Sequence, residues 1–134
     1  MLGELIAEGH GKRTGRRVIS TEGGTFKVEV SFEENGKILG FDTYDIGTYW
    51  STVRPDGSLY GEGEGVVVTP DGAMATWKGG GVGRFGEGGS VHYRGAIYYS
   101  SASPKFARLN TCAAVFEFDV DPQGNTQSKN WEWK

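Results

Sequence analysis

Two glutamates stand at alternate positions near the middle of the sequence. Glu62 and Glu64 are separated by one residue, so in an extended strand both carboxylates project from the same face. Paired carboxylates divide the roles of acid and base when their surroundings push their pKa values apart. A cross-strand ion pair between Glu64 and Lys78 explains the same residues without catalysis. Both interpretations stay open at this stage.

A second polar segment combines histidine, arginine and tyrosine. His92, Arg94 and Tyr98 alternate along one predicted strand, and Arg84 lies on the strand before it. These groups are suited to holding an anion or polarising a carbonyl, although a histidine beside a turn is commonly a surface residue. The polar candidate site predicted from the sequence consists of Trp50, Glu62, Glu64, Arg84, His92, Arg94 and Tyr98.

Metal and cofactor motifs are missing from the sequence. Two histidines and scattered carboxylates show no ligand spacing, so we predict no metal site and no cofactor. Gly81, Gly83 and Gly86 match the G-x-G-x-x-G pattern, but no βαβ unit surrounds them. A single cysteine, Cys112, excludes an intramolecular disulfide, which favours a reducing, cytoplasmic location.

The charge balance bears on the class of partner. Lys and Arg number 14 against 17 Asp and Glu, which gives a net charge of −3. Nucleic-acid binding requires a basic excess, so we predict no nucleic-acid partner. The basic run 12–17 is the one local exception, and it equally fits an edge strand protected by charge. No apolar run approaches the ~20 residues of a membrane helix, so no membrane partner is expected.

Hydrophobic residues alternate with period two along nearly the whole chain, which predicts strands. The segment 25–34 is the clearest case, and it ends at Asn35-Gly36, the dipeptide favoured in type I′ hairpin turns. We therefore predict a turn there and a following strand that starts at Lys37. In this register Phe32 lies opposite Leu39.

Further turns complete an all-β prediction. Pro55-Asp56-Gly57 and Pro70-Asp71-Gly72 fit type I turns followed by a left-handed glycine, and reversals are also expected at 86–89 and 121–125. About eight strands result, at 4–20, 25–34, 37–53, 58–69, 73–85, 90–100, 109–120 and 126–134. The segment 100–108 has room for a short helix but is interpreted as a loop. One domain, 1–134, is predicted to form a closed antiparallel up-and-down barrel, with a two-sheet sandwich as the alternative.

The turn register predicts a glycine-rich inner face. Gly47, Gly61, Gly63, Gly65, Gly79, Gly81 and Gly83 share it with three aromatic residues. Glycines permit strong coiling and leave room for rings to lie across the backbone. The rings either fill the barrel completely or leave an apolar pocket. The residues predicted to line such a pocket are Asp45, Tyr49, Trp77 and Phe85.

The opposite face carries an apolar group on three adjacent predicted strands. Its members are Tyr44, Ile46, Val66, Val68 and Met74. If this face points outward, the patch is too apolar to remain exposed, which predicts a homo-oligomer, a dimer by base rate or a trimer. If it points inward, the barrel interior contains Glu62, Glu64 and Arg84 and becomes a polar site. The apolar residues of 26–32 favour the first assignment.

Several segments resemble known families. The segments 47–51, 61–65, 75–85 and 131–134 are similar to a family of small uncharacterised prokaryotic proteins. In general plan the chain also resembles the allene oxide cyclase-like barrels, which include dirigent-type domains. This resemblance implies a β-barrel fold and suggests a cofactor-free cyclase, but it carries over no catalytic residue.

Two functions follow as hypotheses. The first is binding of a small apolar ligand inside the barrel, with or without a cofactor-free isomerase or cyclase activity. The second is a structural or interaction protein with a solid barrel that acts through its oligomeric surface. Whether the chain is an enzyme is left open by the sequence.

Overall fold

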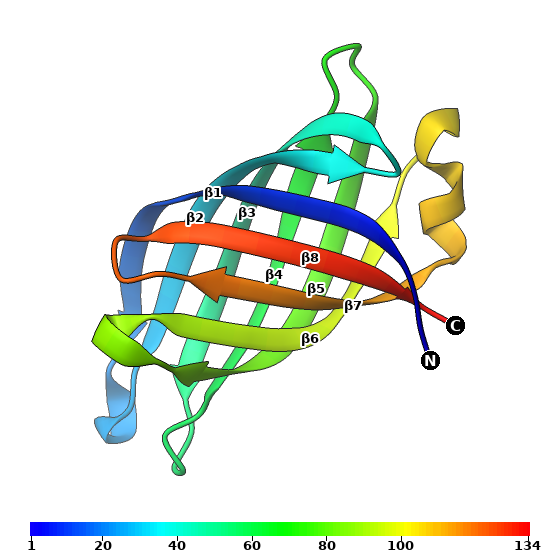
Figure 1. Cartoon of the computed structure of the whole chain (residues 1–134). Coiled ribbons are helices and arrows are strands. Elements are labelled where there is room, and N and C mark those ends of the chain that lie inside the picture. The colour runs from blue at the N-terminus through cyan, green and yellow to red at the C-terminus, as the bar shows by residue number, and fades with distance from the viewer.

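The computed structural model describes all residues, Met1–Lys134, and shows one closed antiparallel barrel in which consecutive strands are neighbours and β8 pairs with β1 (Figure 1). The strands are β1 (Leu2–Ser20), β2 (Lys27–Ile38), β3 (Phe41–Val53), β4 (Leu59–Val68), β5 (Met74–Phe85), β6 (Val91–Ser100), β7 (Ala113–Val120) and β8 (Asn125–Trp133). Short 3₁₀ helices are η1 (Glu22–Gly24), η2 (Glu87–Gly89) and η3 (Pro104–Thr111). The predicted fold class is therefore confirmed.

Three hairpin connections use the same turn chemistry, as the sequence predicts. Gly57, Gly72 and Gly124 all adopt positive φ, at 87°, 90° and 86°. In the first, the Gly57 amide donates to the Arg54 carbonyl at 2.9 Å, and the other two turns repeat this bond. Only glycine reaches this conformation without steric cost, so these glycines fix the position of each turn. The predicted pairs Val53–Leu59 and Gly65–Trp77 are both present.

The predicted turn at Asn35-Gly36 is wrong. β2 continues to Ile38, and the turn falls at Leu39 and Gly40, with φ of 51° and 84°. Gly36 lies within the strand, where an added Cβ would come within 2.0 Å of the Glu8 carbonyl oxygen on β1. Close packing of two strands, and no turn, is therefore the reason for this glycine.

The misplaced turn leaves the assignment of faces intact. Phe32 lies opposite Gly47 instead of Leu39, a displacement of eight residues. Because side chains alternate with period two, an even displacement keeps each residue on its predicted face. Phe32, Val67 and Trp77 are accordingly buried, and the inner-face assignment is confirmed.

A short helix closes one end of the barrel, where the sequence had been interpreted as loop and strand. η3 follows Ser103, with Pro104 in its first turn, where a proline N–H is not needed. Phe106 and Leu109, three residues apart, share one face of the 3₁₀ turn and are both completely buried. β7 therefore begins at Ala113, and not at 109. The structure contains no helix with the length and apolar character needed to cross a membrane.

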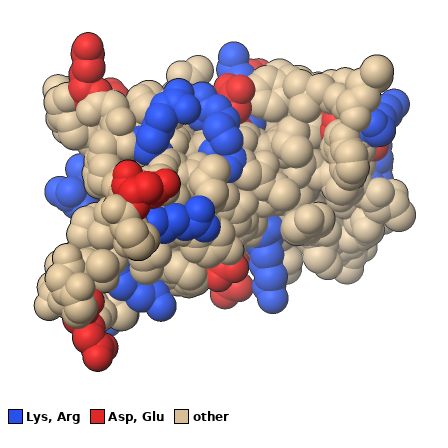
Figure 2. Space-filling view, turned by 90° about the horizontal axis from the view of Figure 1, so that it is seen from below, with Lys and Arg blue, Asp and Glu red and all other residues tan.

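The outer face carries the predicted apolar patch. Tyr44 pairs with Val68, Ile46 with Val66 and Val68 with Met74, so the five side chains are neighbours, and each is exposed. On the face shown in Figure 2, basic and acidic side chains are interspersed among wide areas that carry neither. We call Tyr44, Ile46, Val66, Val68 and Met74 the outer apolar patch.

Candidate functional site

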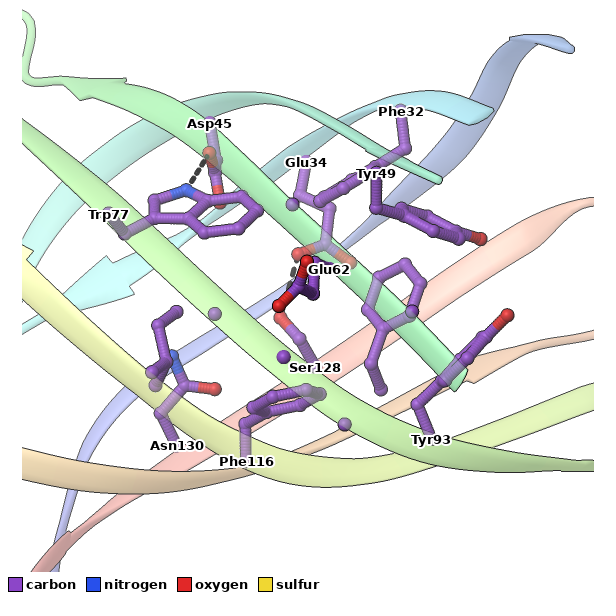
Figure 3. A pocket seen from close by; sticks show the side chains of 17 residues that line it. Phe32, Glu34, Asp45, Tyr49, Glu62, Trp77, Tyr93, Phe116, Ser128 and Asn130 are labelled. Carbon is purple, nitrogen blue, oxygen red and sulfur yellow. Dashed lines mark hydrogen bonds between the residues drawn. The ribbon is translucent and has the colours of Figure 1, made fainter. Parts of the chain in front are cut away.

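The barrel interior contains a cavity of about 80 Å³ (Figure 3). Six aromatic side chains and five glycines form much of its wall, and carboxylate, hydroxyl and amide groups are gathered among them. The lining residues are Phe32, Glu34, Asp45, Tyr49, Gly61, Glu62, Gly63, Trp77, Gly79, Gly80, Gly81, Tyr93, Ile97, Phe116, Phe118, Ser128 and Asn130. A few polar groups in an otherwise apolar cavity are typical of small-molecule sites.

Glycines on β3, β4 and β5 make room for the rings. A Cβ on Gly65 would lie 2.4 Å from Trp77 Cε2, and one on Gly47 would lie 2.6 Å from Phe32 Cζ. Next to the cavity, Gly79 on β5 has no ring against it, because its nearest neighbours belong to the adjacent strand β6. The rings therefore pack over some glycines and leave the backbone around Gly79 as bare cavity wall.

Two carboxylates face each other across β2 and β3 inside the barrel. Glu34 and Asp45 are direct cross-strand partners on the inner face, and Glu34 is only 3% exposed. Opposed residues of antiparallel strands have Cβ atoms about 5 Å apart. Asp45 Oδ1 accepts a hydrogen bond of 2.9 Å from the Trp77 indole N–H, as Figure 3 shows. The barrel thus holds an acid pair beside an aromatic cavity.

The two acids have different hydrogen-bond partners. Glu34 accepts bonds of 2.7 Å from the Thr126 and Ser128 hydroxyls. Burial raises the pKa of Glu34, and these two hydroxyls oppose the rise because they stabilise the carboxylate. Burial also raises the pKa of Asp45, to about 7; the Trp77 bond opposes this rise and the nearby Glu34 charge adds to it. Asp45 therefore titrates near neutral pH.

Further interior polar groups are paired among themselves. Asn130 Nδ2 donates to the Tyr99 hydroxyl at 2.5 Å, and the hydroxyls of Ser51 and Tyr93 are 2.7 Å apart. No buried side-chain nitrogen or oxygen lacks a hydrogen-bond partner. These bonds hold the polar side chains of the wall in fixed positions.

Three of the four residues predicted for an interior pocket line the cavity. Asp45, Tyr49 and Trp77 converge there, whereas Phe85 is 52% exposed at the end of β5 and lies outside it. The Phe85 prediction followed from alternation alone. It fails because the strand leaves the barrel at this residue, so its face no longer has an interior to point into.

Glu34, Ser128 and Asn130 are missing from the sequence prediction. Glu34 is two residues beyond Phe32, so alternation places it on the inner face. The supposed turn at Asn35-Gly36 hid this signal, because it ended the strand at Glu34. Ser128 and Asn130 also alternate on β8, but nothing in the sequence alone indicates that they meet Glu34 and Tyr99 across the closed barrel.

The polar residues predicted as an alternative site lie on the outer face and do not form one cluster. His92 Nδ1 and Arg94 Nη1 both bind Asp119 Oδ1, at 2.8 and 3.0 Å. Arg84 is the cross-strand neighbour of His92. The other members of the set lie apart from this cluster. Trp50 lies beneath Lys27 Nζ, and Glu62 accepts a hydrogen bond of 2.9 Å from the Tyr60 hydroxyl. Glu64 is opposite Lys78, and Tyr98 is exposed. Of this set, Glu62 alone also borders the cavity, at the thin glycine wall.

The Asp119 cluster extends to a serine. Ser90 Oγ lies 3.5 Å from His92 Nε2, so the order serine, histidine, aspartate is that of a hydrolase triad. Ser90 is buried, however, and Gly86 packs so closely that a Cβ there would lie 2.5 Å from Ser90 Oγ. The covered hydroxyl leaves no space for a substrate carbonyl.

No group of three or more His, Cys, Asp or Glu side chains is placed to hold a metal ion.

Comparison with known proteins identifies the fold. No protein-family model matches the chain, and no curated protein matches its sequence. A protein of unknown function from Clostridium acetobutylicum is similar in structure, with a TM-score of 0.82, 14% identity and 96% of each chain covered. A beta-barrel like protein from Acinetobacter baumannii has a TM-score of 0.82 and 13% identity, over 100% of this chain and 96% of its own.

An enzyme from Penicillium herquei is also similar in structure, with a TM-score of 0.71 and 17% identity, over 96% of this chain and 92% of its own. At these identities the likeness concerns the fold and not the activity. The chain is thus a small barrel that shares its architecture with proteins of unknown function and with one enzyme.

Proposed function

We propose that the barrel binds a small unsaturated molecule in its interior cavity and that Asp45 exchanges a proton with it. The observation that carries this proposal is the opposed pair Glu34 and Asp45 in the wall of an aromatic cavity. A catalytic acid or base works best when its pKa lies near the working pH, and the pKa of Asp45, at about 7, satisfies this condition.

The two carboxylates have complementary roles. Glu34 receives two hydroxyl donors, which favour its charged form, while Asp45 receives only the indole N–H. The negative charge on Glu34 makes the second ionisation, at Asp45, unfavourable. Asp45 is therefore the group that gains and loses the proton; burial brings its pKa near neutral pH, and the Glu34 charge adds to this rise.

The size of the cavity restricts the ligand. A dry cavity of about 150 Å³ holds benzene, and the volume here is about 80 Å³. A slim unsaturated chain is therefore a better fit than a ring. The aromatic wall favours apolar contact, and a protonated Asp45 can donate a hydrogen bond to an oxygen atom of the ligand.

The reaction class that fits is isomerisation or cyclisation without a cofactor. Asp45 in its protonated form gives a proton to the ligand, and a proton from another ligand carbon returns to Asp45, so the product has the same composition as the substrate. The resemblance to allene oxide cyclase-like barrels and the enzyme among the structural neighbours support this class.

Two glycine variants test ligand binding. Gly79→Ala places a methyl group on the inner face, into the cavity. The Gly80 backbone also borders the cavity, but the added methyl group of Gly80→Ala lies on the outer face of the strand, with Glu62 Cγ as its nearest atom at 3.4 Å. We expect sorbyl alcohol, a linear dienol, to raise the midpoint of thermal unfolding of the wild type and of Gly80→Ala, and to have little effect on Gly79→Ala. Equal midpoint shifts in all three proteins would place the ligand outside the cavity.

Proton exchange is tested separately. Sorbaldehyde incubated with the protein in D₂O should take up deuterium at its terminal methyl carbon, which conjugation makes acidic. Asp45→Asn should bind the aldehyde and lose the exchange, because asparagine accepts the Trp77 bond but transfers no proton. Exchange that continues at the wild-type rate in Asp45→Asn would contradict the role of Asp45.

The outer apolar patch favours a second candidate role, which is assembly. We propose that it pairs with the same patch on a second copy of the chain, with a closed trimer as the alternative arrangement. These side chains are between 37% and 51% exposed, so burying the exposed part of each contributes on the order of 1 kcal/mol. Glu64 and Lys78 lie opposite each other on the same face and supply charges of both signs, which a two-fold interface can match to itself.

Sedimentation tests the assembly. The wild type should form a discrete oligomer, and Val66→Asp with Val68→Asp should dissociate it, because two carboxylates cannot be buried unpaired. Thr52→Asp with Val82→Asp is the control, since both side chains face outward beside Tyr60, at the other end of these strands from the patch. A monomeric wild type would overturn the assembly role and leave the cavity proposal unaffected.

A further inference from the structure

Two arginines of β1 occupy inner-face positions near the end of the barrel opposite η3. Arg13 is the cross-strand partner of Phe32, and Arg16 that of Val30; both β2 residues are buried on the inner face. Directly opposed residues of antiparallel strands share a face. Arg13 and Arg16 therefore share the inner face; Arg13 is half-buried, and Arg16, nearer the end of the strand, is exposed to solvent.

A β-bulge is responsible for this placement. The register between β1 and β2 shifts between Arg13 and Gly15, so Thr14 is an extra residue without a partner. Without it, residues three apart would project from opposite faces. Bulges re-aim side chains in this way and are frequent beside functional sites. Arg17, the next residue, points outward, and Nη2 lies 3.4 Å from Glu29 Oε2.

The two inward arginines carry uncompensated charge. Neither takes part in a salt bridge, in contrast to Arg17. The Arg13 guanidinium packs on the β7–β8 turn, because a Cβ on Gly124 would lie 3.3 Å from Arg13 Nη2. Both charges act on the Tyr49 phenol in the cavity wall: burial raises its pKa, and Arg13 and Arg16 oppose the rise. The two positive charges therefore influence the cavity wall from the end of the barrel.

The two ends of the barrel differ in closure. At one end η3 buries Phe106 and Leu109 completely (Figure 1). At the other end η1 and η2 bury no residue. Glu34 and Val30 are four residues apart on β2, so Arg16 lies about 13 Å along the strand from the acid pair. The end of the barrel opposite η3 thus carries two positive charges, and the negative pair lies deeper along β2 and β3.

We propose that Arg13 and Arg16 bind the anionic head of a slim unsaturated carboxylate whose chain enters the cavity towards Asp45. This inference rests on the proposed function and names its substrate class. The planar guanidinium groups match a carboxylate, and the Glu34–Asp45 pair repels one. The ligand therefore enters with its head at the arginines and its unsaturated tail near Asp45.

Sorbate and sorbyl alcohol make a matched pair of probes, because they share one carbon chain and differ in charge. We expect the wild type to bind sorbate about tenfold more tightly than the alcohol in calorimetry at low salt. The combined variant Arg13→Gln with Arg16→Gln should lose this preference and keep its affinity for the alcohol. Arg17→Gln is the control for net charge and should keep the preference.

The outcomes separate the two proposals. Equal affinities for sorbate and alcohol in the wild type, or a preference that survives the double variant, would overturn the arginine assignment and leave the cavity function standing. If sorbate binds Gly79→Ala as tightly as it binds the wild type, the carboxylate attaches to surface charge alone. The same conclusion follows if inorganic phosphate binds the wild type as tightly as sorbate does. Failure of both probes to bind the wild type would refute the cavity function itself.

Discussion

The inner pair Glu34 and Asp45 and the outer pair Glu62 and Glu64 contain the same functional groups in contrasting environments. The inner pair lies across two strands and is surrounded by aromatic rings, while the outer pair lies along one strand and is exposed. Water and salt screen the outer charges. Inside the barrel, burial changes the ionisation of both acids. Position relative to the barrel wall thus decides which carboxylates are fit for proton transfer.

The same contrast applies to the aromatic residues. Trp77 fills the space over two glycines and donates to Asp45, so both its ring and its N–H are used. Trp50, on the outer face, packs against Tyr60 and lies beneath Lys27, and it is half-buried. The inner ring is part of the acid site, and the outer ring covers the surface of the sheet.

Replacing the two tryptophans should give the largest difference. Trp77→Ala removes a buried ring and leaves Asp45 without its donor, so we expect a loss of about 3–5 kcal/mol in the free energy of unfolding. Trp50→Ala should cost about 1 kcal/mol, because it loses a cation–π contact and partly exposed packing. Urea denaturation measures both. A loss from Trp77→Ala as small as that from Trp50→Ala would mean that the cavity is already loosely packed.

The pH dependence of stability should distinguish the inner acids from the outer ones. The pKa of Asp45 rises from 3.8 to about 7 on folding, so the unfolded chain releases this proton first. Stability therefore falls as pH rises from about 4 to 7, by on the order of 2–4 kcal/mol. Asp45→Asn should flatten this decline and raise stability at neutral pH, whereas Asp119→Asn on the outer face should leave the decline in place, because the pKa of Asp119 is lowered. Unfolding at a series of pH values checks this prediction, and identical slopes for Asp45→Asn and the wild type would contradict it.

Adding one methyl group at matched glycines should have a smaller effect. Gly65→Ala would bring a Cβ within 2.4 Å of the Trp77 ring, so the ring must move. We expect a loss of about 1–3 kcal/mol. Gly80→Ala faces outward and should change stability by less than about 0.5 kcal/mol. Urea denaturation again measures the difference in stability. Near-ultraviolet circular dichroism reports the displacement of the Trp77 indole.

The outer Asp119 cluster should give the smallest effect. Burial raises the pKa of Asp119, but the bonds to His92 and Arg94 outweigh burial and lower it overall. Its contribution to stability is therefore lost as pH falls through the lowered pKa, the opposite direction to Asp45. About a third of the side chain is exposed to screening, so Asp119→Asn should cost about 1 kcal/mol or less at neutral pH. Chemical denaturation at neutral and acidic pH tests the direction, and a loss larger than that of Gly65→Ala would break the ranking.

The sequence by itself determined the eight strands, apart from the end of β2 and the start of β7, four of the turns, and which residues share a face. Alternation and the positive-φ glycines Gly57, Gly72 and Gly124 are local properties. The turn misplaced at Asn35-Gly36 displaced the strand register by an even number of residues, so each residue stayed on its predicted face. Asp45 and Trp77 were identified for this reason. Long-range packing decided the rest. Gly36 is required by the approach of β1, η3 forms because Phe106 and Leu109 cover the barrel end, and closure of β8 on β1 brings Thr126 and Ser128 to Glu34. These contacts join residues far apart in the chain, so only the folded barrel creates the acid site.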